Sequence, residues 1–326
     1  MGVEGPAGAV VAVGPDGGHG GRAVREEVEL FGWPEQMLGC RHRPTAHAAA
    51  GVVICLGAPF GPALDQGRAA RLGRRLAEAG VAVQRFHPRG SAPSDGDPAA
   101  VSFASLVDDA ARALDLLRDR TGVERVGLVG VRLGALVAAR LAQRDRSVPV
   151  AVWEPVVDPL AMVEHAAAAR AAALHPTASS EGRDPSGLTV GPGDTRPLDL
   201  FETALCGELI DRAAIGDLGD ELRGRSGGLL VVQSGPGEAL VPAYQSLVDM
   251  CRAHQVAVEA RCHPCDAERD GTVVPGASPD ALVDTTASWL AARLLPAVAA
   301  PPPPSFTPPG SPTRDMRPAG QDRPRG

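Results

Sequence analysis

The chain has 326 residues, a formal net charge of −7, 44% hydrophobic residues and only 3% aromatic residues. This length suffices for one large α/β domain or two small ones, with a core built mainly from Ala, Val and Leu. The negative net charge, and the lack of a basic stripe interleaved with aromatic residues, argue against a nucleic-acid partner.

The sequence shows neither the pattern of a signal peptide nor that of a membrane span. Residues 1–22 are Gly-rich, contain acidic residues and lack the apolar core of a signal peptide. No stretch approaches the ~20 apolar residues of a membrane span. We therefore expect a cytoplasmic protein without a membrane span, whose six cysteines are reduced rather than bridged.

The first half of the chain alternates between strand and helix patterns. A flexible leader at 1–22, with a short strand at 10–13, precedes the regular elements. Strands are predicted at 24–31, 37–42, 51–56, 81–86, 126–129 and 148–153, and helices at 65–79, 103–120 and from 133 onward. The alternation between residues 50 and 153 predicts an α/β fold with a mostly parallel sheet and right-handed crossovers.

A long interruption follows. Residues 155–226 are predicted to be a helical cap inserted over the sheet. Within it we expect a helix from Asp158 to about His175, a polar stretch at 177–196 and a helical pattern over 198–222. The domain prediction is a leader (1–22), a core in two parts (23–154 and 227–296), the cap (155–226) and a Pro-rich disordered tail (297–326).

The second part of the core completes the predicted sheet. Strands are expected at 228–233 and 256–261, with a helix at 242–253 between them. Ser278-Pro279 opens the last predicted helix, which runs to Leu295.

One motif carries most of the functional information. Gly130-Val131-Arg132-Leu133-Gly134 follows a short apolar run and precedes a small-residue helix. The glycine spacing is that of the G-x-S-x-G turn, which raises a nucleophilic serine over the end of a sheet. Here the central residue is Arg132, and a protonated guanidinium cannot attack a carbonyl carbon.

The order of motifs resembles the α/β-hydrolase superfamily in its serine-aminopeptidase-like branch, and more narrowly the exosortase-associated hydrolases. The likeness covers roughly residues 24–296. The segments that carry it are Gly57-Ala-Pro-Phe-Gly61, the loop Phe86 to Asp97, the elbow at 130–134 and Val152 to Asp158. The resemblance implies an α/β-hydrolase fold with a cap, and a small-molecule substrate containing an ester, amide or acyl group.

The resemblance also implies positions for the catalytic groups. The elbow position falls on Arg132, the acid on Glu238 and the base on His263. The oxyanion N–H groups fall on Leu133 and Phe60. Glu238 also fits a solvated loop residue, and His263 comes earlier than expected after its strand, so it also fits a half-exposed strand end. His87, at another strand end, is an alternative for the base.

Two functions stay open from the sequence. The chain is either a hydrolase that works without an elbow serine, or a non-catalytic protein that binds an anionic small molecule through Arg132 and backbone N–H groups. Arg132 needs a negative partner, for which Glu238, Glu154 and Asp158 are candidates. A bound anion is the interpretation we favour, because the elbow points toward the substrate region of the resembled fold. No cofactor is expected, and the oligomeric state is open.

A second motif is Cys262-His263-Pro264-Cys265. A redox C-x-x-C would open a helix after an early strand, whereas this one ends a late strand. A zinc site would need a second pair of ligands. Two incidental thiols are the interpretation we favour, with redox chemistry and metal binding as alternatives; no metal is predicted.

Overall fold

The structure is a computed structural model that describes residues 11–13, 24–56, 63–159, 198–200, 203–205, 216–235, 238–264 and 281–296. The predicted cap helix after Asp158, the polar stretch at 177–196 and the tail at 297–326 lie outside these residues, apart from Asp158 and Pro159.

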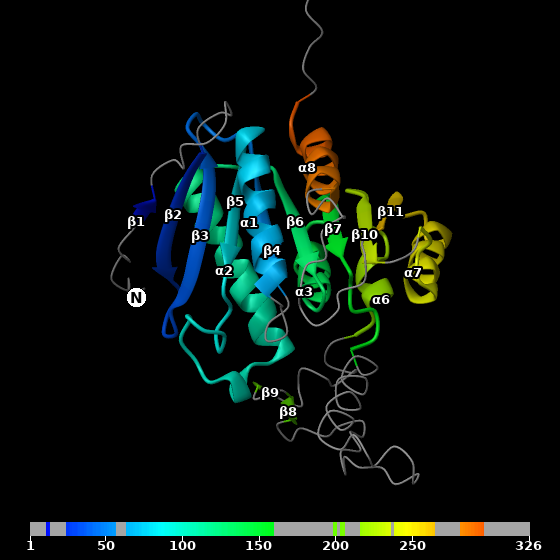
Figure 1. Ribbon diagram of the computed structural model, residues 1–326, viewed down its shortest axis with the longest axis horizontal. Coiled ribbons are helices and arrows are strands. Elements are labelled where there is room, and N and C mark those ends of the chain that lie inside the picture. Colours follow the sequence, from blue (N-terminus) through cyan, green and yellow to red (C-terminus); the bar gives the residue numbers. More distant parts are fainter. Residues whose placement is uncertain are drawn as a thin grey trace, which may run out of the picture. The chain divides into compact units, whose positions relative to one another are not determined.

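Within the described residues, nine strands form one sheet in the order β1-β2-β3-β5-β4-β6-β7-β10-β11 (Figure 1). The strands are β1 (Val11–Val13), β2 (Val24–Phe31), β3 (Met37–Pro44), β4 (Ala50–Cys55), β5 (Val81–Phe86), β6 (Val126–Val131), β7 (Val150–Trp153), β10 (Leu229–Gly235) and β11 (Val258–Pro264). From β1 to β5 the neighbours are antiparallel, and from β5 to β11 they are parallel. The predicted mostly parallel α/β sheet is therefore confirmed.

Helices cover both faces of the sheet. The helices are α1 (Ala63–Glu78), α2 (Phe103–Thr121), α3 (Gly134–Leu141), α6 (Leu218–Leu222), α7 (Pro242–Ala253) and α8 (Ala281–Leu294). On one face α1 packs beside α8, and on the other α2 contacts α3, which contacts α6. Each face has its own cluster of buried apolar side chains.

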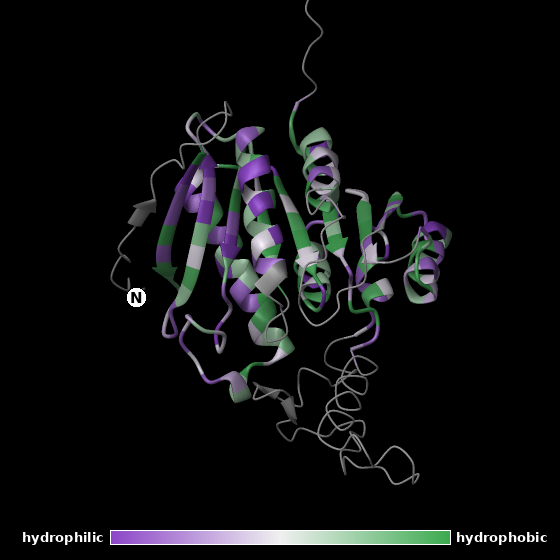
Figure 2. Cartoon of the chain, viewed as in Figure 1, coloured by the Kyte–Doolittle hydropathy of each residue, from purple (hydrophilic) through white to green (hydrophobic). Residues whose placement is uncertain are grey.

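The central strands are apolar on both sides because both faces are covered. Every residue of β4, β6 and β7 is buried. Figure 2 shows these strands as mainly hydrophobic, whereas β2 and β3 carry many hydrophilic residues. Helix ends follow local signals: α2 begins in a capping box at Ser102 and Ser105 and ends at Gly122, which has a left-handed φ of 70°.

The prediction of helix over 198–222 is wrong for most of its described part. Leu198–Leu200 (β8) and Thr203–Leu205 (β9) form a two-stranded antiparallel ribbon, and only Leu218–Leu222 (α6) is helical. Short apolar runs do not distinguish strand from helix, and Leu198-Asp199-Leu200 also has the alternation of a strand. Leu218 and Leu222 are fully buried in the core that contains α3, so α6 is part of the core packing.

Charged residues are buried between the β2–β3 hairpin and α2. Arg41 on β3 donates to Glu29 and, through Nη2 at 2.7 Å, to Glu27, both on β2. Arg120 of α2 donates to Glu29 at 3.0 Å. We call Arg41, Glu27, Glu29 and Arg120 the hairpin network. Because Arg41 is 2% exposed and Glu29 1%, these charges are stable only as pairs.

None of the helices that the structure describes is long and apolar enough to span a membrane.

Candidate functional site

The turn between β6 and α3 has the backbone of a nucleophile elbow. Arg132 has φ 52°, a left-handed conformation that is uncommon for a residue with a side chain. A Cβ on Gly130 would lie 2.4 Å from Ala135 Cα, and a Cβ on Gly134 would lie 2.1 Å from the Cys55 carbonyl oxygen. Both positions therefore require glycine. The turn has kept its close packing with arginine at its centre.

The Arg132 guanidinium lies between two carboxylates. Nε donates to Asp65 Oδ2 at 2.9 Å, and Nη2 lies 3.1 Å from Glu154 Oε2. Arg132 is 32% exposed, Glu154 18% and Asp65 only 3%. Asp65 is in the first turn of α1, where the helix dipole favours a negative charge. The positive charge at the elbow is thus compensated within the protein.

Arg68, one turn further along α1, joins the same group. Its Nη1 lies 3.7 Å from Asp65 and 3.9 Å from Glu154. The Ser234 hydroxyl donates to the Glu154 carboxylate. We call Arg132, Asp65, Glu154, Arg68 and Ser234 the elbow cluster. Its two guanidinium groups and two carboxylates balance in charge.

The backbone presents Glu154 to this cluster. Glu154 follows β7 and has φ 44°, a second left-handed residue at the same end of the sheet. Its N–H donates to the Val232 carbonyl at 2.9 Å, and the Arg132 N–H donates to Trp153 at 2.9 Å. Tyr244 of α7 lies near this cluster. Burial raises the pKa of its phenol to about 12, and the negative charge of Glu154 adds to the shift.

The structure brings the predicted acid and base to the same edge as the elbow, at the ends of β10 and β11. Glu238 is exposed in the loop after β10. That loop is held by Gln233, whose Oε1 accepts from Val241 N–H at 2.8 Å and whose Nε2 donates to Ala239. His263 ends β11 as the register partner of Ser234. Burial, with a contribution from Arg261, lowers the pKa of His263.

These residues do not form a hydrogen-bonded triad within the described part of the chain. Nε2 of His263 is buried with no hydrogen-bond partner there. Glu238 acts electrostatically on the Cys262 thiol, whose pKa burial and this carboxylate raise. Cys40, Cys55 and Cys251 are free thiols, and Cys265 lies outside the described residues, as does Phe60.

The other predicted oxyanion residue, Leu133, is the N-cap of α3. Its side chain is buried, and its backbone stands at the helix N-terminus, where N–H groups have no intrahelical acceptor. The Leu133 backbone thus lies directly after the elbow residue at a helix N-terminus, the position for which the sequence predicted an oxyanion N–H.

The loop between β5 and α2 is held by polar contacts of its own. Arg89 donates from its backbone and side chain to the fully buried Asp109, at 2.9 and 2.6 Å. Ser94 accepts from Leu38 N–H at 2.9 Å and donates to the His87 carbonyl at 2.6 Å. Burial, with a contribution from Arg85, lowers the pKa of His87. This loop makes structural contacts, as its turn-forming composition suggests.

Three members of the elbow cluster, Asp65, Arg68 and Ser234, were not found from the sequence. Asp65 stands 67 positions before Arg132, and Ser234 comes directly after the buried run of β10. The available signal was positional. Both follow predicted parallel strands, whose carboxyl ends lie at one edge, and polar residues at that edge of an open sheet mark ligand sites.

Comparisons with known proteins bear on the fold of the chain. Residues 52–189 match the family model described as serine aminopeptidase, S33. No curated protein sequence matches the chain.

Solved structures resemble the chain over most of its length. Est1E from Butyrivibrio proteoclasticus, solved with ferulic acid bound, is 16% identical with a TM-score of 0.58, over 81% of this chain and 98% of that chain. Proline iminopeptidase from Mycobacterium smegmatis is 16% identical with a TM-score of 0.55, over 83% and 99%. An esterase from Pyrococcus furiosus is 14% identical with a TM-score of 0.53, over 88% and 91%. At such identities the likeness concerns the fold.

Proposed function

Because this chain has an α/β-hydrolase fold and matches the serine aminopeptidase, S33, model over residues 52–189 yet carries Arg132 at the elbow, we propose that it binds a small anionic molecule there without serine-type catalysis. The observation that carries the proposal is the guanidinium held between Asp65 and Glu154 where a hydrolase presents its hydroxyl. Arginine stays protonated in proteins and has no lone pair to offer a carbonyl carbon.

The partner of Arg132 differs from the one that the sequence favoured. We expected a bound anion, whereas the guanidinium already contacts two carboxylates of the protein, one of them the candidate Glu154. An anionic ligand must therefore exchange with a carboxylate. Glu154 is the exchangeable one, because it is more exposed than Asp65 and has a strained backbone.

The exchange leaves a suitable site. With Glu154 displaced, Arg132 would keep Asp65, and Arg68 would supply a second guanidinium beside the ligand. Guanidinium groups bind carboxylates and phosphates in a bidentate manner. The backbone N–H groups at the start of α3 add donors of the kind that bind anions at helix N-termini.

A thermal-shift experiment tests this proposal. We expect carboxylate or phosphate-ester compounds from a panel to raise the Tm of the wild type and to lose this effect in Arg132→Ala. Arg252→Ala is the matched control, because Arg252 is an exposed arginine of α7 whose described ion pair is with Asp249. If no anion stabilises the wild type, the binding proposal fails and Arg132 is a structural replacement for a nucleophile.

A second function, hydrolysis by another route, is favoured by one observation. The Ser234 hydroxyl is hydrogen-bonded to Glu154 and stands in register with His263, so one hydroxyl, one carboxylate and one imidazole share this edge. Labelling of wild-type Ser234 by a fluorophosphonate would support this route and contradict the non-catalytic proposal.

Placing a serine at the elbow tests whether the protein contains a working base and acid for it. We expect Arg132→Ser to remain a poor esterase on short p-nitrophenyl esters, because a serine needs a base within hydrogen-bond reach and an acid behind it. Turnover near the ~10 s⁻¹ typical of enzymes would reveal a working base–acid pair built on His263 and Glu238.

The narrower relationship is also a proposal. The elbow arginine and the Trp153-Glu154-Pro155 segment support placement beside the exosortase-associated hydrolases, with action in the cytoplasm. A gene neighbourhood containing an exopolysaccharide or protein-sorting cluster would support this placement. A neighbourhood without one, in several genomes that carry the gene, would contradict it.

A further inference from the structure

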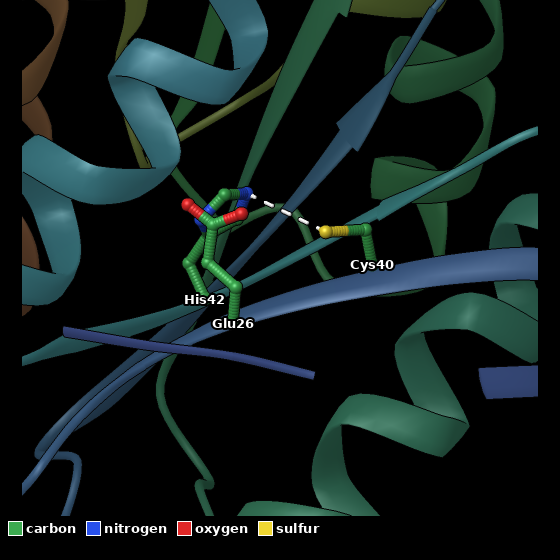
Figure 3. Close-up of side chains that lie close together, drawn as sticks. All are labelled: Glu26, Cys40 and His42. Carbon is green, nitrogen blue, oxygen red and sulfur yellow. Dashed lines mark hydrogen bonds and ion pairs between the residues drawn. The ribbon is translucent and has the colours of Figure 1, made fainter. Parts of the chain in front are cut away.

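Three side chains of types that ligate metals meet on one face of the sheet, between the β2–β3 hairpin and α1. Glu26 lies on β2 opposite His42 of β3, and Cys40 lies on the same strand two residues earlier. The side chains face α1, where a Cβ on Gly73 would lie 2.5 Å from the His42 ring. Figure 3 shows the carboxylate, imidazole and thiol gathered in one place.

The distances suit a small cation. One ligand atom from each of Glu26, Cys40 and His42 lies within 4.8 Å of the other two, and Cys40 Sγ is 3.9 Å from His42 Nε2. Tetrahedral Zn²⁺ with bonds of about 2.3 Å to sulfur and about 2.0 Å to nitrogen separates those atoms by about 3.5 Å. A contraction of a few tenths of an ångström would complete the geometry.

In the structure, the guanidinium of Arg85 on β5 supplies the positive charge beside the His42 and Cys40 side chains. Its Nε donates to His42 Nε2 at 2.8 Å, and its Nη2 donates to Cys40 Sγ at 3.2 Å. Arginine only donates hydrogen bonds, so Nε2 must be the unprotonated nitrogen. The His42 proton is then on Nδ1, which lies 3.4 Å from Glu26 Oε1.

This arrangement prepares the histidine to bind a metal. Nδ1 of His42 lies 3.4 Å from Glu26 Oε1 without a hydrogen bond, so the bond from Arg85 fixes the tautomer and keeps Nε2 unprotonated, the form that binds a metal. His42 is fully buried, so its orientation is set by its neighbours. Oε1 of Glu26 accepts from Arg74 Nε at 2.6 Å, and no hydrogen bond to Oε2 is found among the described residues, which leaves Oε2 available as a metal ligand.

We propose that Cys40, His42 and Glu26 form a binding site for a thiophilic divalent cation such as Zn²⁺, which takes the place of the Arg85 guanidinium. Binding releases the Cys40 thiol proton to solvent, and the half-buried Arg85 side chain moves outward. Sγ, Nε2 and the carboxylate then provide three ligands, and water provides the fourth. None of these residues belongs to the elbow cluster, so the site does not depend on the function proposed for Arg132.

Co²⁺ is the probe for this site, because a thiolate bound to Co²⁺ gives an intense charge-transfer absorption in the near ultraviolet. Titration of the full chain should give this band for one ion per chain, and Zn²⁺ should abolish it. Cys40→Ser should remove the band. Arg85→Gln should bind Co²⁺ about tenfold more tightly or better, because a competing positive charge a few ångströms away is removed.

The competing thiol site is the C-x-x-C at Cys262 and Cys265, so the control is the double variant Cys262→Ser/Cys265→Ser, which should keep the band. A band that survives Cys40→Ser and disappears in this control would overturn the proposal. So would the lack of a thiolate band in both the wild type and Arg85→Gln at millimolar Co²⁺. The second criterion holds even if Cys40→Ser does not fold.

Discussion

The hairpin network and the elbow cluster solve the same electrostatic problem in different backbones. In each, one arginine lies between two carboxylates from neighbouring elements. Arg41 extends from the middle of a regular antiparallel pair and is almost fully buried. Arg132 and Glu154 instead stand at strand ends with left-handed backbones, and a third of the Arg132 side chain is exposed.

The difference separates a structural role from a site that can exchange partners. Removing charges from water is costly, and the hairpin network recovers that cost only if every partner stays in place. The elbow cluster has more contact with solvent and includes two strained residues, which proteins keep mostly where function requires them. The comparison predicts that equivalent substitutions will have unequal effects in the two places.

The largest effect is expected for Arg41→Ala. The change leaves Glu27 and Glu29 buried with fewer cationic partners, and breaking such a buried pair costs about 3–5 kcal/mol. Urea unfolding of the variant and the wild type measures this difference. Arg43→Ala is the control, since Arg43 is the more exposed partner of Glu27 and should cost at most about 1 kcal/mol. Equal losses in the two variants would contradict the structural role of Arg41.

Arg132→Ala should destabilise the protein less, by about 1–3 kcal/mol. Asp65 is left buried, but Arg68 remains within 3.7 Å of it, and part of the Arg132 interaction is screened by water. Chemical denaturation without ligand is the measurement. A loss as large as that of Arg41→Ala would make the elbow cluster a second structural network and would weaken the proposal of an exchangeable site.

Arg132→Gly should be more stable than Arg132→Ala by about 1 kcal/mol. Both variants remove the guanidinium, but only glycine adopts a φ near 52° without a steric cost. Their two unfolding midpoints give the backbone strain at the elbow separately from its electrostatics. A less stable glycine variant would show that the left-handed turn is not strained.

Ser234→Ala should have the smallest effect, at most about 1 kcal/mol, because Glu154 keeps Arg132 as its partner when the hydroxyl is lost. An added anion should raise the Tm of this variant more than it raises the Tm of the wild type, since Glu154 becomes easier to displace. A Tm drop with no change in response to any anion would assign Ser234 a purely structural contact.

The sequence predicted the strands well, because runs such as residues 126–131 are buried on both faces and contain few residues that suit another structure. It also located the elbow, whose glycine spacing is required by close packing against Ala135 and Cys55 and is visible in the motif itself. The pairing of Arg132 with Asp65 could not be read in the same way, because it depends on how α1 packs against the end of β6. The helix predicted over 198–222 failed because β8 pairs with β9, a contact that local periodicity does not contain.

The hydrogen bonds at the elbow also link three strands mechanically. The Arg132 N–H reaches β7 at Trp153, the Glu154 N–H reaches β10 at Val232, and the Val156 N–H returns to the Arg132 carbonyl at 3.2 Å. The end of β7 is bonded to both of its neighbours, so sliding β7 along its axis would strain bonds to β6 and to β10. The three amides should therefore open to solvent as one unit with a single opening free energy, which an anion bound at Arg132 would raise for all three together.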